Sequence, residues 1–392
     1  MRIGIVVEVF DPRRGGAESW TCQHVRQLLD HGHEVHVFAG TAAPFLFHPR
    51  LHLHLFGRLR SRLARAEAAA AALRHVSLDV VHDIGAGWGG DVFQSEDGSR
   101  LAQWERLLQT LPPSLRPIKR ALFHVLPRYA DFRRLAETQF GDPHRLQIAV
   151  SRMCALDYQR FHQVPEDRIR IIYHGTDLER FTPALRRQYR RSLRAELAVS
   201  DQTVVFLFVG HDHVRKGLAT AQRAVGRLAA QGAPVCLVVA GERQRSQPRS
   251  RPTPPAYVRF AGRVNDMPAL YSAADVFVLP TFYDPCSLSV GEAAASGLPV
   301  VTTRCNGASE LLTEGVEGFV LDDPADDVGL AQRLTELLDQ ELRDRQGAAA
   351  RRLAEAYPSE RNCAEILAVY AEVCAARKQR RIASDTSQRR AA

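Results

Sequence analysis

Two carboxylates, Asp284 and Glu292, stand eight residues apart in a segment whose pattern suits the binding of an anion. The apolar run 275–280 before them predicts a buried strand, and the pattern becomes helical from about Ser287 or Ser289. Backbone N–H groups at a helix start lack partners within the helix and, with the helix dipole, attract negative charge. Carboxylates beside such a site suit the hydroxyl groups of a phosphorylated ligand. The alternative is structural, because Ser289 and Glu292 have the spacing of a capping box.

Two basic residues at another predicted strand–helix junction could bind a diphosphate. Arg215 and Lys216 follow the apolar run 203–210 and precede a helical pattern that begins at Leu218. A guanidinium can donate two parallel hydrogen bonds to phosphate oxygens, whereas an ammonium acts as a compact point charge. A solvated basic loop is the alternative for this pair.

The first loop of the chain ends in two glycines, Gly15 and Gly16, between a strand predicted at 2–8 and a helix predicted from Ala17. Glycine lets the backbone approach a ligand closely, although a plain connector also uses it. The chain has no G-x-G-x-x-G motif, which disfavours a dinucleotide cofactor.

A second pair of acids, Glu96 and Asp97, follows a short strand predicted near Phe93. Carboxylates in such a loop could act on the hydroxyl group of an acceptor. They could equally form a turn before Gly98, and taken alone the residues favour the turn.

The elements that position these residues alternate between strand and helix in both halves of the chain, which predicts an α/β fold with two parallel sheets. The segment from 39 to about 57 is expected to be a basic loop. Open α/β sheets bind ligands at the carboxyl ends of their strands. Two such sheets facing one another would leave a cleft, which is a usual place for a ligand.

Composition limits the class of protein. The 392 residues exceed one comfortable core, so two domains are expected, and 45% apolar with 24% charged residues is typical of globular proteins. We expect no signal peptide and no membrane-spanning segment. Seven cysteines without C-x-x-C spacing indicate reduced thiols in the cytoplasm rather than a zinc or disulfide framework. The net charge of +8 favours polyanionic partners.

The segment 100–134 is amphipathic and basic, with eight Arg or Lys residues against two acids, a net +6. Cationic and aromatic residues on amphipathic helices suit the surface of an anionic membrane. A helix with a solvated basic face packed on the sheet is the alternative. Nucleic acid is disfavoured, because no DNA- or RNA-binding signature accompanies the charge.

Together these motifs resemble a known family. Asp284–Glu292 resembles the E-x7-E element of retaining glycosyltransferases of the family 4 type, which have the GT-B fold of two Rossmann-like domains. The other motifs follow in family order: Gly15-Gly16-Ala-Glu18, His174-Gly-Thr-Asp177, Gly210…Arg215-Lys216-Gly217, Arg263-Val264 and Gly297-Leu-Pro-Val300. Arg128–Phe132, with Glu137 and Phe140 after it, is similar to the lipopolysaccharide core (heptose I) glucosyltransferases. The resemblance extends to about residue 376.

This resemblance implies transfer of a hexose from a nucleotide sugar, UDP-glucose or a related UDP-sugar, with retention of configuration and without a metal or other cofactor. The implied acceptor is a hydroxyl group of a lipopolysaccharide-core-like or other glycan or glycolipid, at the inner face of the cytoplasmic membrane. Residues 1–177 are the expected acceptor-side domain and 178–358 the nucleotide-sugar domain. A helix at about 359–376 is expected to pack back on the first domain, and 377–392 to be a basic, disordered tail.

The resemblance also assigns roles by motif position. For the nucleotide, it assigns the diphosphate to Arg215 and Lys216, the base and phosphate to Arg263 and Val264, and the ribose hydroxyls to Glu292. For the donor sugar, it assigns the hydroxyl groups to Asp284, and backbone contacts with sugar and phosphate to Ser287 and Leu288. Gly15 and Gly16 would close over the phosphate, and Asp97 would take an acceptor-side catalytic position. Two residues depart from the family pattern: Asp284 replaces Glu, and Ser287 replaces a common Gly. Both bear on the identity of the donor sugar.

Two other functions fit the same scaffold. One is a nucleotide-sugar epimerase, and the other is a non-catalytic relative that binds membrane. The basic segment 100–134 favours the transferase over a soluble epimerase. The presence of Arg215, Lys216 and Glu292 argues against a non-catalytic protein.

Overall fold

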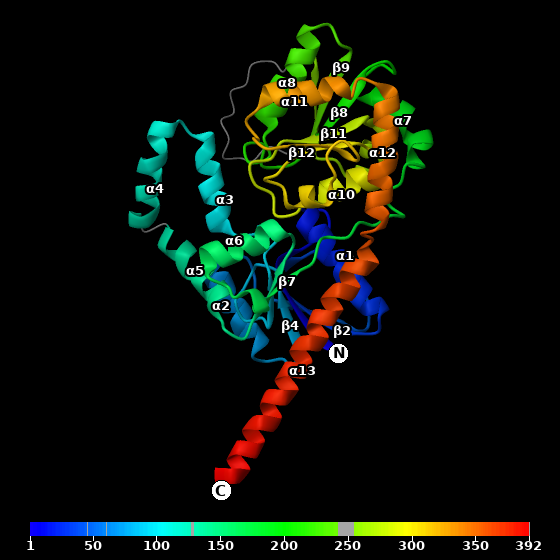
Figure 1. The fold of residues 1–392 in the computed structure, drawn as a ribbon. Helices are drawn as coiled ribbons and strands as arrows, with labels where there is room; N and C mark the ends of the chain where they lie inside the picture. Colours follow the sequence, from blue (N-terminus) through cyan, green and yellow to red (C-terminus); the bar gives the residue numbers. More distant parts are fainter. Residues whose placement is uncertain (45, 60, 127–128, 242–254, 392) are drawn as a thin grey trace. The chain divides into compact units, whose positions relative to one another are not determined.

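The computed structural model describes residues 1–44, 46–59, 61–126, 129–241 and 255–391 (Figure 1). Within them the chain forms two compact units. The first comprises Met1–Ala102, Leu111–Ile172 and Glu360–Ala392, and the second comprises Gln103–Thr110 and Tyr173–Ser359. Each unit contains one parallel sheet with helices, as the alternating pattern predicts.

The first unit is built on a seven-stranded sheet in the order β3-β2-β1-β4-β5-β6-β7. Its strands are β1 (Arg2–Phe10), β2 (Glu34–Ala42), β3 (Leu51–Leu55), β4 (Val80–Asp83), β5 (Val92–Gln94), β6 (Leu146–Ala149) and β7 (Ile169–Ile171). The central strands bury Ile and Val on both faces, because helices cover both sides of a parallel sheet. The helices of this unit are α1 (Gly16–Asp30), α2 (Arg62–Leu73), α4 (Arg116–Val125), α5 (Ala130–Gly141) and α6 (Arg152–His162), with α13 (Ser359–Ala391) and α3 (Arg100–Leu107) shared with the second unit.

One strand of this sheet was not expected. The segment 39–57, predicted as a basic loop, instead extends β2 to Ala42 and forms β3, which pairs in parallel with β2. That prediction is wrong, because Leu51-His-Leu-His-Leu55 has the period of two that a strand requires. β3 is the edge strand, where imidazoles can face the solvent.

The second unit is built on a six-stranded sheet in the order β10-β9-β8-β11-β12-β13. Its strands are β8 (Val204–Val209), β9 (Val235–Ala240), β10 (Val258–Gly262), β11 (Val276–Leu279), β12 (Val300–Thr303) and β13 (Gly318–Leu321). Its helices are α7 (Leu185–Glu196), α8 (Leu218–Ala230), α9 (Met267–Ala273), α10 (Leu288–Ala295), α11 (Asp327–Glu336) and α12 (Gln340–Glu355). Every side chain of β9 and β11 is buried.

The end of the chain differs from the expected disordered tail. Helix α13 continues to Ala391, and residues 377–391 contain neither glycine nor proline, so no residue there interrupts a helix. In the first unit, Tyr370 of α13 contacts His24 and His82 through its hydroxyl group, at 3.1 and 2.7 Å from their ring nitrogens. Across the described part of the chain, no helix has the length and apolarity needed to cross a membrane.

Both sheets have a point at which the chain reverses its direction of strand addition. In the first unit it lies between β1 and β4, and in the second between β8 and β11. Loops at such a point diverge to opposite sides of the sheet and leave a crevice at the carboxyl ends of the strands. These two crevices are therefore the positions where each unit is expected to bind a ligand.

Candidate functional site

The reversal point of the second sheet joins two of the predicted site residues. Lys216 lies in the loop after β8, Asp284 lies in the loop after β11, and their side chains form an ion pair. Both are mostly buried, with 13% of the lysine side chain and 8% of the aspartate side chain exposed. Burial lowers the pKa of Lys216, and Asp284 opposes that effect. The two charges thus neutralise one another at a largely buried position.

Arg215 fixes the same two loops to one another. Its Nη1 donates to the carbonyl oxygen of Tyr283 at 2.9 Å, and its Nε lies 3.3 Å from Asp212. Its own carbonyl accepts from the backbone N–H of Phe282 at 2.8 Å and from the Thr281 hydroxyl at 3.0 Å. The basic pair is therefore held by the loop that carries Asp284, and is not a freely solvated basic loop.

Gly217 allows this close approach of the two loops. It has a φ of +78°, a region that favours glycine, and it caps the start of α8. A Cβ atom at this position would lie 1.8 Å from the carbonyl oxygen of Pro280. A side chain here would push Lys216 away from the loop after β11.

Glu292 has a different partner from the one that a capping box requires. Helix α10 begins at Leu288 with Ser287 as its N-cap, so Ser289 lies inside the helix and the capping-box interpretation is wrong. The Glu292 carboxylate instead accepts from the Tyr271 hydroxyl of α9 at 2.8 Å. Burial raises the pKa of Glu292, whereas the bond from Tyr271 acts in the opposite direction.

The start of α10 is fixed by a residue that the sequence did not single out. The backbone N–H of Ser287 donates to Oδ1 of Asn306 at 3.2 Å, and the Ser287 hydroxyl lies 2.8 Å from that of Ser289. Asn306 also pairs with Asp284 in an isolated parallel bridge. Asn306 therefore positions both Asp284 and the N-terminus of α10, where Leu288 is the first helical residue.

The remaining predicted residues of this unit lie along the same edge of the sheet. Arg263 and Val264 follow β10, which is two strands from β8, and Arg263 is exposed. Loops that follow parallel strands share one edge, so the structure brings Arg215, Lys216 and Asp284 into contact and places Arg263 farther along that edge.

The predicted acceptor-side residue, Asp97, lies in the loop after β5, the strand that pairs with β4 next to the reversal point of the first sheet. Asp97 forms an ion pair with Arg100 and has 56% of its side chain exposed. It lines a cavity of about 160 Å³ that is bounded by residues of β1, α1, α2, α3, α5 and α6 and of the loops after β4 and β5. The other polar lining residues are Glu8, Glu18, Thr21, Arg62, Ser95, Glu96, Arg100, Gln139 and His162, and the rest are apolar or glycine. Asp97 therefore faces a cavity of mixed polar and apolar lining.

Glu18 is a further acid of this cavity. It lies in the first turn of α1, which starts at Gly16 after the N-cap residue Gly15. A Cβ on Gly15 would lie 2.8 Å from the Glu18 carboxylate, so glycine leaves room for that side chain. Burial raises the pKa of Glu18. Its position within the Gly15-Gly16-Ala-Glu18 motif was the signal that could have identified it.

The second unit contains a segment that matches a known protein family. Residues 203–340 match the family described as "Glycosyl transferases group 1". That segment runs from the start of β8 to the start of α12 and contains Arg215, Lys216, Asp284 and Glu292. The Lys216–Asp284 pair thus lies within the segment that matches this family.

Curated relatives match longer stretches of the chain than this family does. The D-inositol 3-phosphate glycosyltransferase of Corynebacterium glutamicum (strain R) is 27% identical over 260 residues, 63% of this chain and 62% of the relative. Spore coat protein SA of Bacillus subtilis (strain 168) is 27% identical over 222 residues, 52% of this chain and 58% of the relative. The chain thus spans less than two thirds of the length of these relatives.

Solved structures agree over nearly the whole chain. WaaG, a glycosyltransferase involved in lipopolysaccharide biosynthesis, is similar with a TM-score of 0.77 and 19% identity, covering 94% of this chain and 99% of WaaG. HepE of Anabaena, solved in complex with UDP-glucose, has a TM-score of 0.71 and 18% identity, covering 95% of this chain and 100% of HepE. At such identities the likeness establishes the fold, and the predicted GT-B fold is confirmed.

Proposed function

We propose that this protein is a retaining glycosyltransferase that moves a hexose from a nucleotide sugar to a hydroxyl group of a glycan or glycolipid. The observation that carries the proposal is the Lys216–Asp284 pair at the reversal point of the second sheet. An ammonium and a carboxylate side by side match a ligand that has both a diphosphate and neutral hydroxyl groups. The group 1 match over the same residues supports the reaction class.

In the proposed reaction the Lys216–Asp284 ion pair opens, and each of the two side chains binds a part of the donor instead. Lys216, with Arg215 beside it, takes the diphosphate, and Asp284 accepts hydrogen bonds from the sugar. The bond from the anomeric carbon to the diphosphate oxygen breaks, and the acceptor oxygen forms a bond to the same face of that carbon. The acceptor proton passes to a phosphate oxygen of the departing nucleoside diphosphate. Fixed positive charge at the leaving group is the type of interaction that contributes most to such catalysis.

UDP-glucose or a related UDP-sugar is the proposed donor, with no metal required. Support comes from HepE, a structural relative solved with UDP-glucose, and from Glu292 of α10, whose carboxylate is held by the Tyr271 hydroxyl and could bind ribose hydroxyls. For the acceptor we propose a lipopolysaccharide-core-like glycan, because charged side chains that can bind hydroxyl groups line the cavity around Asp97 and WaaG shares the fold. Arg263, Val264, Leu288, Gly15 and Gly16 keep the roles that the family resemblance implies.

A panel of nucleotide sugars tests the donor. A ligand that binds only the folded protein raises its stability, by about 2.7 kcal/mol at a hundred times its dissociation constant. We expect UDP-sugars to raise the unfolding temperature and to be hydrolysed slowly, with the same rate in the presence of a chelator. Release of an epimerised UDP-sugar would instead identify the protein as an epimerase. Stabilisation of the protein by a nucleotide sugar without any turnover would identify it as a non-catalytic relative. If no UDP- or GDP-sugar stabilises the protein, the donor site is wrongly assigned.

Contact with an anionic membrane is proposed for the basic segment 100–134, part of which (Arg128 included) lies outside the described residues. Its predicted helices are present as α3, α4 and α5. Along α4 and the turn before it, four apolar side chains at helical spacing are exposed: Leu115, Ile118, Leu122 and Val125, by 48%, 58%, 43% and 77%. Arg116, Lys119 and Arg120 stand between them. This is the composition of a helix that lies on an anionic surface, here the inner face of the cytoplasmic membrane.

Vesicle flotation tests the membrane proposal. We expect the protein to float with anionic vesicles and much less with neutral ones, and the double substitution Ile118→Glu with Leu122→Glu to abolish flotation. Leu156→Glu is the matched control, because Leu156 is a 64% exposed leucine on α6, outside this stripe. Equal failure of the wild type on both kinds of vesicle, or equal loss in the control, would contradict the proposal.

A further inference from the structure

Four polar residues lie together on one face of the β2–β3 pair. Glu34 and His36 come from β2, and His52 and His54 come from β3, at alternate positions that point to the same face. The parallel register sets His36 opposite His52. The ring of His36 stacks on those of His52 and His54, with centroids 4.6 and 5.3 Å apart. None of the four has a predicted role in sugar transfer.

Three of these residues direct ligand atoms at one point. Oε1 of Glu34 lies 2.9 Å from Nε2 of His36 and 3.5 Å from Nε2 of His52. All three ligand atoms lie within 4.8 Å of one another. Zinc binds imidazole nitrogen and carboxylate oxygen at about 2.0–2.2 Å in a tetrahedral arrangement, which separates neighbouring ligand atoms by about 3.4 Å. The two distances to Glu34 are within about 0.5 Å of this separation, and rotation of the half-exposed His52 side chain can bring the third ligand atom into place.

We propose that Glu34, His36 and His52 form a binding site for a zinc-like transition-metal dication. Two imidazoles and a carboxylate are a donor set that such ions prefer. The side chain of His36 is 6% exposed, whereas those of Glu34 and His52 are 36% and 43% exposed. The ion can therefore enter from the solvent, and water can take the fourth position.

His54 acts on the site through His36 and is a positioning residue. Its Nε2 lies 3.0 Å from Nδ1 of His36. Without metal, His54 can donate to Nδ1 while Nε2 of His36 donates to Glu34. With metal, the proton of His36 moves to its Nδ1 and is donated to Nε2 of His54, which then carries its own proton on Nδ1. This change leaves Nε2 of His36 as the ligand. A hydrogen bond at the second ring nitrogen is the usual support of a metal-bound histidine.

One neighbouring charge competes with the ion. Nε of Arg2 lies 3.3 Å from the same Glu34 oxygen, across the β1–β2 pair. The arginine side chain is 43% exposed, so it can move into solvent when the metal binds. Removal of Arg2 should therefore strengthen metal binding, whereas removal of a ligand should weaken it.

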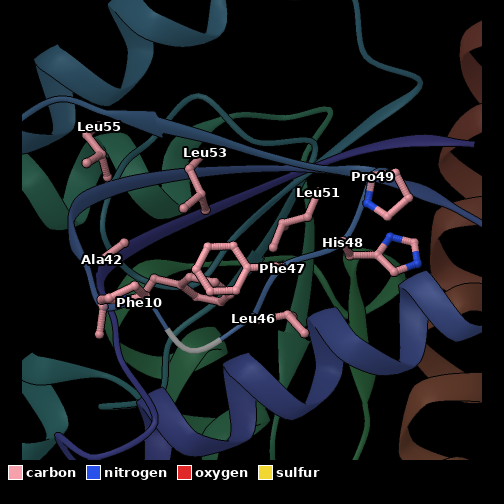
Figure 2. A pocket seen from close by; sticks show the side chains of 11 residues that line it. Phe10, Ala42, Leu46, Phe47, His48, Pro49, Leu51, Leu53 and Leu55 are labelled. Atoms are coloured by element: carbon pink, nitrogen blue, oxygen red, sulfur yellow. The ribbon is translucent and has the colours of Figure 1, made fainter.

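A metal ion at this site would also affect the opposite face of β3. There Leu51, Leu53 and Leu55 line an apolar hollow of about 610 Å³ together with Phe10 and Phe47 (Figure 2). β3 is an edge strand that pairs only with β2 among the described strands. An ion bridging His52 to Glu34 and His36 would fix β3 to β2, and with it one wall of this hollow.

Zinc and cobalt(II) titrations of the chelator-treated full chain test the site. We expect one zinc ion per chain, a raised unfolding temperature, and cobalt(II) absorption bands typical of tetrahedral nitrogen and oxygen ligands. His52→Ala and Glu34→Gln should remove all three signals, His54→Phe should weaken binding about tenfold or more, and Arg2→Gln should tighten it. His75→Ala is the matched control, because His75 is an exposed histidine outside the cluster.

Three outcomes would overturn the proposal: metal binding retained in both ligand variants, a thiolate-to-cobalt band that reveals cysteine ligands, or binding lost equally in His75→Ala. Since an edge-strand substitution could disturb β3 itself, His52→Asn provides a second polar variant. Unfolding midpoints measured with chelator should equal the metal-free wild type for His52→Ala and His52→Asn. If the midpoints of these variants differ from that of the metal-free wild type, the test rests on the cobalt(II) spectrum of the wild type. A wild-type spectrum without tetrahedral bands would contradict the proposed site.

Discussion

Replacement of Lys216 by methionine is expected to lower the rate of sugar transfer by about 10²–10³-fold or more, because it removes a fixed positive charge from the leaving diphosphate. The same change should weaken binding of both UDP and the UDP-sugar. Asp284→Asn should weaken binding of the UDP-sugar more than that of UDP, because Asp284 is proposed to contact sugar hydroxyls only. Initial rates and calorimetric titration with both ligands measure these effects.

The control must separate an effect of Lys216→Met on sugar transfer from an effect on folding, because the Lys216–Asp284 ion pair is mostly buried. Lys216→Met leaves the Asp284 carboxylate without its partner, which costs about 3 kcal/mol or more of stability. The double variant with Asp284→Asn removes both charges and should recover most of that stability. Transfer should nevertheless stay low in the double variant. A wild-type rate in the stable double variant would remove Lys216 from the mechanism.

The parts of the site that could be predicted from the sequence are those specified by residues close to one another in the chain. The contact between Lys216 and Asp284 could be anticipated, because both follow apolar runs and loops at the carboxyl ends of parallel strands converge. The cap of α6 is another local feature: the Ser151 hydroxyl accepts from the backbone N–H of Cys154 at 3.2 Å, a bond between residues only three positions apart.

The parts that were missed depend on packing between distant segments. Asn306 binds the N–H of Ser287 across 19 residues, and Tyr271 reaches Glu292 across 21 residues. No local pattern specifies either bond. The capping-box spacing of Ser289 and Glu292 was misleading, because the helix starts one residue before Ser289 and a tyrosine from α9 binds the carboxylate. β3 was missed because His at alternate positions lowers the apolar signal of a strand.

Asp275 holds the start of β11, and therefore the loop that carries Asp284. One carboxylate oxygen of Asp275 contacts Arg190 at 2.6 Å and Arg186 at 3.0 Å. The other accepts from Arg194 at 3.1 Å and from the backbone N–H of Val205 at 2.8 Å. The Asp275 and Arg194 side chains are only 6% and 1% exposed. Helix α7 and strands β8 and β11 are thus joined at one buried carboxylate.

Asp275→Asn is therefore expected to lower the free energy of unfolding by about 3–5 kcal/mol, because it leaves the buried Arg194 guanidinium without its counter-charge. Denaturant unfolding measures the loss. Asp201→Asn is the matched control: Asp201 approaches the same Arg194 at 3.9 Å but is 78% exposed, so its loss should stay within about 0.5 kcal/mol. Equal effects of the two substitutions would show that burial of Asp275 is not the cause.

The pH dependence of this difference follows from the pKa of Asp275. Burial acts to raise the pKa, but Arg190, the N–H of Val205 and Arg194 outweigh it and hold the pKa below the ordinary 3.8. A depressed folded-state pKa means that the carboxylate contributes its full stability above the ordinary value and loses it as the pH falls through the folded-state pKa. The difference between the wild type and Asp275→Asn should therefore be full above pH 3.8, shrink as the pH falls below 3.8, and vanish below the folded-state pKa, where a protonated Asp275 resembles asparagine. A difference that stays constant as the pH falls well below 3.8 would assign the effect of Asp275→Asn to packing rather than to charge.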